Sequence, residues 1–401
     1  MAVIALLLDG MEGHYLPTFK LAKELRARGH EVCYLGLAGA APMVRREGFE
    51  LAPILGSLLP AAGRPGEGHA GGDWFASLVS GEALDAALER IRPAVVIMLS
   101  IYYCEAMVVH VRYRLPVLLL TTFCRPTDIA RADMIEGLIA SRLMELKSAV
   151  MAELLRLIDG SGNRFRSFQE LAQMVVRMPE LVLLPRALEL PGIAGEPHLH
   201  YIGTGIDLAR SAEPFPWEAV DTARSLVFCS LGSHAEIAAA TARRFFHAVV
   251  GAAADDPQRQ FILAVGRAFD PAELGSVPGN LYLSQWVPQL EVLRRADLMV
   301  THGGAGTAKE CVLMGVPMVV MPLVRDQFEM ARRIVHHGLG VAGDASQSTA
   351  GTLGALIGRV AVDEAMRRRL ATWRDLALRE DRAGLGVEVV EAAVSAAAAA
   401  R

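Results

Sequence analysis

Short, uniformly apolar runs alternate with amphipathic helical patterns along the first half of the chain. The apolar runs read AVIALLL, EVCYLGL, AVVIMLS and PVLLLTT. Strands of a parallel sheet are buried on both faces, so they carry apolar residues at nearly every position. Between the first two runs, LPTFKLAKELRARG has the apolar spacing of a helix, with Pro17 in its first turn and Gly29 at its end. The alternation predicts a doubly wound parallel sheet of the α/β class.

The same alternation begins again in the second half of the chain. The strands predicted there read SLVFCSLGS, QFILAVG, NLYLSQW, DLMVTHG and VPMVVMP. A chain of 401 residues also exceeds the size at which one hydrophobic core usually keeps growing. We therefore expect two Rossmann-like domains, residues 1–205 and 221–378, that face one cleft. A Gly- and Pro-rich linker at 206–220 would join them, and a last helix at 379–401 would pack back on the first domain.

Two segments interrupt this rhythm. Residues 56–72 are rich in glycine and proline, which predicts a mobile loop. Residues 128–178 carry a long amphipathic pattern rich in methionine and leucine. Such helices can simply cover the sheet. They can also form a flap over an apolar substrate site. Methionine suits such a flap because its flexible side chain adapts to different shapes.

The composition excludes several classes of protein. A formal net charge of -4 and a pI near 6.3 give no electrostatic basis for binding nucleic acid. The apolar runs fall short of the roughly 20 residues that span a bilayer, and the first run meets Asp9 too early for a signal peptide. The 5 cysteines are scattered and form no C-x-x-C pair, which argues against disulfides and zinc. We expect a cytoplasmic protein with no integral membrane segment, while weak membrane association and a homodimer stay open.

The stretch VTHGGAGTAKECVLMG places glycines at the junction between a predicted strand and a predicted helix. Gly303, Gly304 and Gly306 have no Cβ to obstruct a ligand, so the free N–H groups at the helix start can reach it. The positive end of the helix dipole favours an anion such as phosphate there, and His302 and Thr307 add donors. The stretch alone could equally be a tight structural turn, since it has neither Walker nor G-x-G-x-x-G spacing.

Side chains around this helix start suit the rest of a nucleotide sugar. Trp286 offers a surface on which a base can stack, and Gln289 provides a nearby amide. Glu310 stands one turn into the helix, where its carboxylate could accept both hydroxyls of a ribose. Asp326 and Gln327 could bind hydroxyls of the sugar. Each of these residues alone also fits a structural role, such as a core aromatic, a solvated helix residue or a helix cap. Their order and spacing favour a site for base, ribose, diphosphate and sugar.

This region resembles the nucleotide-sugar signature of the UDP-glycosyltransferase family, which includes plant natural-product and bacterial antibiotic-type enzymes. The matching positions are Trp286, Pro288, Gln289, His302, Gly304, Thr307, Glu310, Gly315, Pro317, Pro322, Asp326 and Gln327. The N-terminal GMEGHYLPTFKLAKELRARGHEV is similar to the first loop and helix of the same family. The resemblance implies the GT-B fold, two Rossmann-like doubly wound domains facing a cleft. It also implies that Gly13, Ser233, Val287 and Gly306 belong to the nucleotide-sugar site.

The resemblance further implies a mechanism centred on His14. This residue follows the first predicted strand near the positive end of a helix, which favours the neutral imidazole that can accept a proton. His14 would deprotonate an acceptor hydroxyl, which attacks the anomeric carbon opposite the departing nucleoside diphosphate and inverts its configuration. Many relatives support this histidine with an aspartate after the fourth strand. Here Leu99 or Ser100 stands at that place, and Glu105 or Tyr102 could take over the role.

The expected function is metal-independent, inverting transfer of a sugar from a nucleotide sugar to a hydroxyl of a small hydrophobic natural product. No D-x-D sequence occurs, so we expect no metal and no cofactor, the nucleotide sugar being a co-substrate. Glu310 favours UDP over dTDP, because a deoxyribose leaves one hydrogen bond unmade. The alternatives are a non-catalytic GT-B-like nucleotide-binding or auxiliary protein, a nucleotide-sugar epimerase and a lipid-linked cell-wall transferase. The sequence leaves the sugar and the acceptor open.

Overall fold

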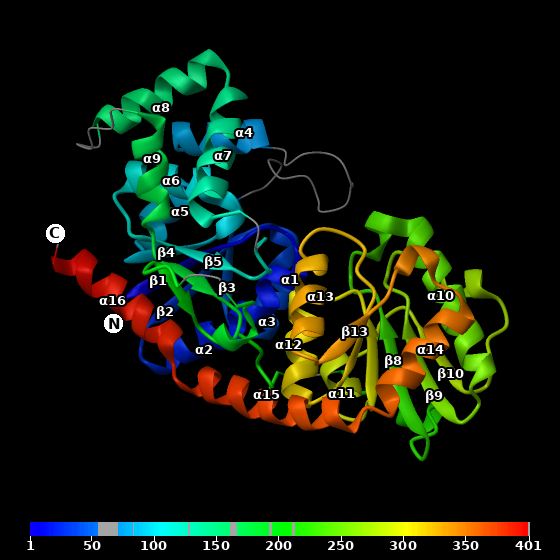
Figure 1. Ribbon diagram of the computed structural model, residues 1–401. Coiled ribbons are helices and arrows are strands. Elements are labelled where there is room, and N and C mark those ends of the chain that lie inside the picture. Colours follow the sequence, from blue (N-terminus) through cyan, green and yellow to red (C-terminus); the bar gives the residue numbers. More distant parts are fainter. Residues whose placement is uncertain are drawn as a thin grey trace.

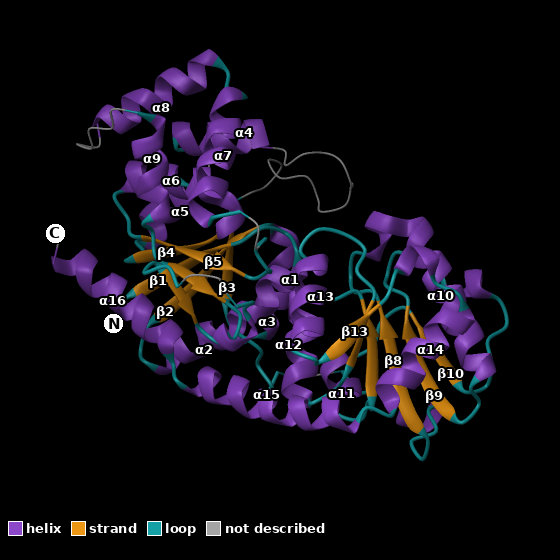
Figure 2. Cartoon of the chain, viewed as in Figure 1, coloured by secondary structure: helices purple, strands orange, loops and turns teal. Residues whose placement is uncertain are grey.

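The computed structural model describes residues 1–54, 71–82, 84–126, 129–160, 167–191, 195–210 and 213–399. Over these residues the chain forms two all-parallel sheets with helices around each, which Figure 2 shows as two separate groups of orange strands. The expected pair of doubly wound α/β domains is confirmed. The loop expected at 56–72 lies outside the described residues except for its last two, which begin a helix.

The first sheet has seven strands in the order β3-β2-β1-β4-β5-β6-β7. These strands are β1 (Val3–Leu7), β2 (Glu31–Gly36), β3 (Glu50–Pro53), β4 (Val95–Leu99), β5 (Val117–Thr121), β6 (Glu180–Val182) and β7 (Leu199–Tyr201). The order reverses between the neighbours β1 and β4. At such a switch point the loops after the two strands run in opposite directions, which leaves room for a ligand at the carboxyl edge. The segment after β1 contains His14.

The second sheet has six strands in the order β10-β9-β8-β11-β12-β13. Its strands are β8 (Ser225–Ser230), β9 (Arg259–Ala264), β10 (Leu281–Ser284), β11 (Leu298–Thr301), β12 (Met318–Val320) and β13 (Gly340–Ala342). Here the order reverses between β8 and β11. The segments after these two strands contain Ser233 and His302. Both switch points therefore lie next to residues that the sequence singles out.

The helices surround both sheets. Those of the first domain are α1 (Glu12–Tyr15), α2 (Phe19–Ala27), α3 (Ala41–Arg46), α4 (Gly71–Ser80), α5 (Asp85–Ile91), α6 (Tyr103–Tyr113), α7 (Arg131–Met144), α8 (Ser148–Gly160) and α9 (Phe168–Val176). Those that follow are α10 (Ala239–Asp255), α11 (Gln289–Leu293), α12 (Ala305–Met314), α13 (Gln327–His336), α14 (Ala350–Ala361), α15 (Glu364–Arg382) and α16 (Leu385–Ala399). None of these described helices is long and apolar enough to cross a membrane.

The apolar runs of the sequence become strands because each sheet is covered on both faces. All residues of β4 and β5 are buried, as their uniform apolarity requires. The strands β6, β7 and β13 were not predicted. Each has only three residues, which is too short a run to carry a periodic signal.

The segment expected at 128–178 forms α7, α8 and α9. Helix α7 contacts α6 and α9, and α8 contacts α4 and α6. In Figure 1 these helices lie at the top of the first domain, above its sheet. Leu138, Met144 and Leu155 keep their side chains exposed. The apolar face of this segment thus packs largely on other helices, and part of it stays at the surface.

The end of the chain runs back from the second domain to the first. Helix α15 contacts α12 of the second domain, whereas α16 contacts α2, β4 and β7 of the first domain. The two helices appear in red along the lower edge of Figure 1, and the chain turns between them at Gly384, whose φ is 68°. The expected linker at 206–220 lies between β7 and β8, with residues 211–212 outside the described part.

Candidate active site

His14 is held by an aspartate that the sequence analysis did not assign to it. In α1, its Nδ1 lies 2.8 and 2.9 Å from the two carboxylate oxygens of Asp9, which follows β1. Asp9 Oδ1 also accepts a hydrogen bond from the Met11 amide at 2.9 Å, which fixes the carboxylate against the start of the helix. A carboxylate can only accept, so Nδ1 carries a proton, and in the neutral imidazole the lone pair then lies on Nε2. This is the tautomer that can take a proton from a hydroxyl.

The expected support of His14 by Glu105 is wrong. Glu105 lies in α6 with only 6% of its surface exposed, and its carboxylate faces Arg142 of α7 at 3.5 Å. Burial raises the pKa of Glu105, and Arg142 opposes that rise. The partner of His14 comes from the end of β1 and not from the segment after β4. A signal for it existed in the sequence, because Asp9 is a charged residue directly after an apolar strand and five positions before the histidine.

The glycines after β11 have the close contacts that their sequence predicts. Gly303 has a φ of 81°, and a Cβ there would stand 2.6 Å from Val320 Cγ1. A Cβ on Gly304 would overlap the imidazole of His302. Gly304 is also the N-cap of α12 and supplies no side-chain cap, so the first N–H groups of that helix are left for another partner. Gly306 is exposed, with nothing within 4 Å of its ideal Cβ.

His302 stands between the two loops of the second switch point. A Cβ on Gly232, in the loop after β8, would come within 2.5 Å of its Cε1 atom. Burial, together with the nearby His234, lowers the pKa of His302 to about 4. The imidazole is therefore neutral near pH 7 and can donate one hydrogen bond, but it supplies no positive charge. His234, which the sequence analysis did not single out, also pairs with Glu236 at 3.2 Å.

Three of the predicted residues form one cluster along the start of α12. Gln289 donates from Nε2 to Glu310 Oε2 at 2.6 Å and to Thr307 Oγ1 at 3.2 Å. The other carboxylate oxygen of Glu310 faces Nη2 of Arg210 at 2.9 Å, an ion pair that the sequence did not predict. Glu310 is 3% exposed, so little water reaches its carboxylate. Its charge is compensated inside the protein by the guanidinium of Arg210.

Asp326 and Gln327 form the junction between β12 and α13. The Gln327 side-chain oxygen accepts hydrogen bonds from the backbone amides of Leu323 and Val324 at 2.8 and 3.1 Å. These two hydrogen bonds fix the side chain, and its NH₂ group stays available to donate to a ligand. Arg325, just before them, has a φ of 54°, a left-handed conformation that is strained for a residue with a side chain.

The remaining predicted residues differ in how accessible their side chains are. Trp286 is 42% exposed, as a stacking surface must be. Ser233 and Gly13 are also exposed, in the turn after β8 and in α1. The Val287 side chain lies in the core of the second domain at 5% exposure, so this residue can offer a ligand only its backbone.

The two halves of the site meet across the domain boundary. Burial raises the pKa of Asp326, and hydrogen bonds from its own backbone and from that of Cys124 oppose that rise, as do the neighbouring His14 and Arg325. Asp326 thus lies close to the first domain and within electrostatic reach of His14. In Figure 1, α1 and α13 stand next to each other between the two sheets. In the part of the chain that the structure describes, no three His, Cys, Asp or Glu side chains group as metal ligands do.

Comparison with known proteins shows what this chain is similar to. Residues 258–392 match the family model described as erythromycin biosynthesis protein CIII-like, C-terminal domain. Demethyllactenocin mycarosyltransferase of Streptomyces fradiae is 27% identical over 99% of this chain and 88% of its own length. Oleandomycin glycosyltransferase of Streptomyces antibioticus is 38% identical over 40% of this chain, but only over 36% of its own length. The crystal structure of the kitacinnamycin glycotransferase covers 98% of this chain and 99% of its own, with a TM-score of 0.78 and 29% identity.

These findings support a natural-product UDP-glycosyltransferase family for this chain. It is a glycosyltransferase enzyme with the GT-B fold, as the resemblance of its signature implied. The family match at 258–392 contains the whole signature from Trp286 to Gln327.

Proposed function

We propose that this glycosyltransferase transfers a sugar from a nucleoside diphosphate to a hydroxyl of a small hydrophobic natural product, with inversion at the anomeric carbon. The observation that carries the proposal is the His14–Asp9 pair of the first domain, which lies within electrostatic reach of Asp326 of the nucleotide-sugar signature. A base from one domain and a donor site from the other are the two parts that such a transfer needs.

His14 is the proposed general base. With Asp9 bound to the proton on Nδ1, the lone pair on Nε2 accepts the proton of the acceptor hydroxyl. The oxygen then forms a bond to the anomeric carbon, and the bond between that carbon and the diphosphate oxygen breaks. The electron pair leaves with the nucleoside diphosphate from the face opposite the attack, and this inverts the configuration.

The N-terminus of α12 is the proposed binding site for the diphosphate. Its free N–H groups and helix dipole favour the negative charge that develops on the leaving group. Thr307 and Ser233 add hydroxyl donors, and His302 adds a neutral imidazole donor. No D-x-D sequence occurs in the chain, and we propose that these groups act without a metal ion.

The proposed donor is a UDP-sugar. Trp286 stacks on the base and Glu310 accepts the ribose hydroxyls, of which a 2′-deoxyribose has one fewer. Proteins of the same fold at 18% and 22% identity were solved with thymidine diphosphate, so both nucleotides belong in the test. The antibiotic names of the curated relatives support a natural-product acceptor. The five free thiols fit the reducing environment of the cytoplasm, where we propose that the enzyme acts.

The test offers UDP-sugars and dTDP-sugars together with a panel of hydrophobic natural products to the wild type and to His14→Ala. We expect the wild type to form a glycoside with inverted configuration, to prefer UDP-sugars and to remain active in EDTA. His14→Ala should lose about 100-fold or more in kcat. His247→Ala, which removes an exposed histidine of α10, is the matched control and should remain active.

Three results would contradict the proposal. Equal turnover by His14→Ala and the wild type would remove the assigned base. Binding of UDP without transfer or hydrolysis across the panel would indicate a non-catalytic protein. A new epimer formed from the donor alone would indicate an epimerase. The non-catalytic alternative was based on the lack of an aspartate after β4 to support His14. Asp9 places a carboxylate in contact with His14, which argues against that alternative.

A further inference from the structure

The ion pair between Arg210 and Glu310 joins the interdomain segment to the proposed ribose site. We propose that Arg210 is a positioning residue that holds the Glu310 carboxylate in place to receive the ribose hydroxyls of the donor. The inference rests on the proposed function, because it takes Glu310 as the ribose acceptor. It adds that recognition of the ribose depends on a residue outside the family signature and outside the second sheet.

The geometry of the carboxylate supports this role. Arg210 Nη2 lies 2.9 Å from Oε1, and Gln289 Nε2 lies 2.6 Å from Oε2. Each oxygen is thus held by a different donor, and the plane of the carboxylate is fixed from both sides. An ionised carboxylate offers about four lone-pair positions. Two are used by these partners, which leaves about one on each oxygen for the 2′- and 3′-hydroxyls.

The charge of Arg210 matters because Glu310 is buried. Its side chain is 4% exposed, whereas that of Arg210 is 20% exposed. A buried carboxylate without a partner of opposite charge is strongly destabilised. Lys309 also interacts electrostatically with Glu310, but its Nζ donates to the carbonyl of Leu183 in the first domain at 2.7 Å and not to the carboxylate. Gln289 supplies a hydrogen bond but no charge. Arg210 is therefore the cation in direct contact with the Glu310 carboxylate.

Contacts with both domains set the position of Arg210. It ends a turn that starts at Asp207, whose Oδ1 accepts from the Ala209 amide at 2.9 Å. Asp207 Oδ2 pairs with Lys23 of α2 in the first domain at 2.7 Å. On the other side, Arg294 donates to the Leu208 carbonyl at 2.9 Å from beside α11. The turn is fixed between the domains, and it presents Arg210 to Glu310.

The test measures binding of UDP and of 2′-deoxy-UDP by calorimetry to the full-length protein and its variants. We expect Arg210→Ala to weaken UDP binding about tenfold or more, since a charge-assisted contact is lost. We expect a smaller loss for 2′-deoxy-UDP, so the variant should discriminate less between the two nucleotides. Arg210→Lys should recover part of the discrimination. In the double variant Arg210→Ala/Glu310→Ala, removal of Arg210 should add little to the effect of Glu310→Ala alone.

A matched control is Arg243→Ala, which breaks an exposed Arg–Glu pair in the same domain and should leave both affinities unchanged. Wild-type affinity of Arg210→Ala for UDP, or a loss equal for both nucleotides, would overturn the inference. Tighter binding of UDP would overturn it too, because Arg210 would then obstruct the ribose. If the wild type itself binds no nucleotide, it is the proposed function that fails. Circular dichroism and thermal melting confirm that each variant is folded.

Discussion

The contact of Asp9 with His14 fixes which nitrogen of the imidazole can act. Both carboxylate oxygens lie within 2.9 Å of Nδ1, so the proton stays there and Nε2 keeps its lone pair. An asparagine in place of Asp9 can still accept from the Met11 amide through its oxygen. Its NH₂ group, however, would favour a lone pair on Nδ1 and hence a proton on Nε2.

We therefore expect Asp9→Asn to lower kcat about 100-fold or more with little change in folding. The loss should be smaller for a phenolic acceptor, because a more acidic hydroxyl needs less help from a base. Steady-state kinetics with an alcohol and a phenol acceptor would measure this. Asp375→Asn, an exposed change on α15, is the control. Unchanged kcat in Asp9→Asn would show that the tautomer does not matter.

The neutral state of His302 predicts a dependence of stability on pH. Its pKa is about 4 in the folded chain, against an ordinary value of 6.5, because of its burial and of the nearby His234. Between these two values the unfolded state binds more protons than the folded state. The free energy of unfolding therefore falls as the pH drops from about 6.5 towards 4.

The variant His302→Gln should lose this part of the pH dependence. Urea unfolding at several pH values between 7 and 4.5 would show a flatter decline for the variant than for the wild type. His247→Gln removes an exposed histidine and should keep the wild-type slope. Parallel slopes of His302→Gln and the wild type would contradict the neutral assignment.

At the scale of elements, the start of α12 combines tight packing with an open side. Gly303 and Gly304 cannot accept a side chain without displacing Val320 or His302. Gly306, the second residue of the helix, is exposed and has free space where its Cβ would stand. The glycines of one turn thus have two different uses. Two allow the loops to pack, and the third leaves room in front of the helix.

The variant Gly306→Ala separates ligand binding from folding. A methyl group at an exposed helical position should raise stability by about 0.5–1 kcal/mol, because alanine loses less backbone freedom on folding. If the diphosphate binds at this helix end, the same methyl group should weaken UDP binding about tenfold. Thermal melting and calorimetry would measure the two effects.

Helix α14 offers a matched control for this experiment. Gly351 is also the second residue of an exposed helix start, with nothing within 4 Å of its ideal Cβ. Gly351→Ala should give the same gain in stability and leave UDP binding unchanged. Equal UDP affinity of Gly306→Ala and Gly351→Ala would place the diphosphate away from α12.

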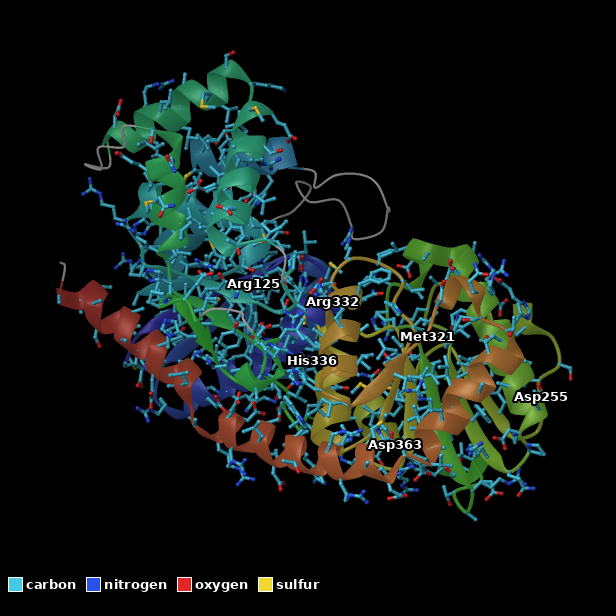
Figure 3. All side chains as sticks on the ribbon, in the orientation of Figure 1. Arg125, Asp255, Met321, Arg332, His336 and Asp363 are labelled. Carbon is cyan, nitrogen blue, oxygen red and sulfur yellow. The ribbon has the colours of Figure 1, made fainter. Side chains whose placement is uncertain are left out.

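At the scale of the whole molecule, buried polar contacts join the two domains. Arg333 of α13 is 1% exposed and lies 2.7 Å from Glu189 Oε2, which belongs to the first half of the chain. It also donates to the Arg125 carbonyl at 3.3 Å. Figure 3 shows Arg125 in the first domain near α13, on which Arg332 and His336 are labelled. Such contacts hold α13, whose N-cap is Asp326, against the first domain.

Loss of Glu189 should therefore destabilise the molecule and disturb the site together. Glu189→Ala leaves the buried Arg333 with Glu329 as its remaining carboxylate partner at 3.2 Å. We expect a loss of about 2–3 kcal/mol in the free energy of unfolding. Glu273→Ala breaks an exposed pair with Arg243 and should cost less than about 1 kcal/mol. Denaturant unfolding of the two variants would compare them, and equal small losses would mean that the domain contact contributes little.

The sequence by itself determined the two parallel sheets and the glycine-rich start of α12. The signals for both are local, since a strand buried on both faces needs an unbroken apolar run and a tight turn needs glycine at a defined position. The same holds for the order of the signature residues from Trp286 to Gln327. Which of these residues bind the donor stays a prediction, and the variants above test it.

Only the tertiary structure decided which side chains meet. Glu105 was the expected partner of His14, but the fold gives this role to Asp9 and pairs Glu105 with Arg142. The fold also brings Arg210 from the interdomain segment to Glu310. A carboxylate pairs with whichever opposite charge or donor the packed chain places within about 3 Å. That distance follows from how strands, helices and turns pack together, and residue order alone does not contain it.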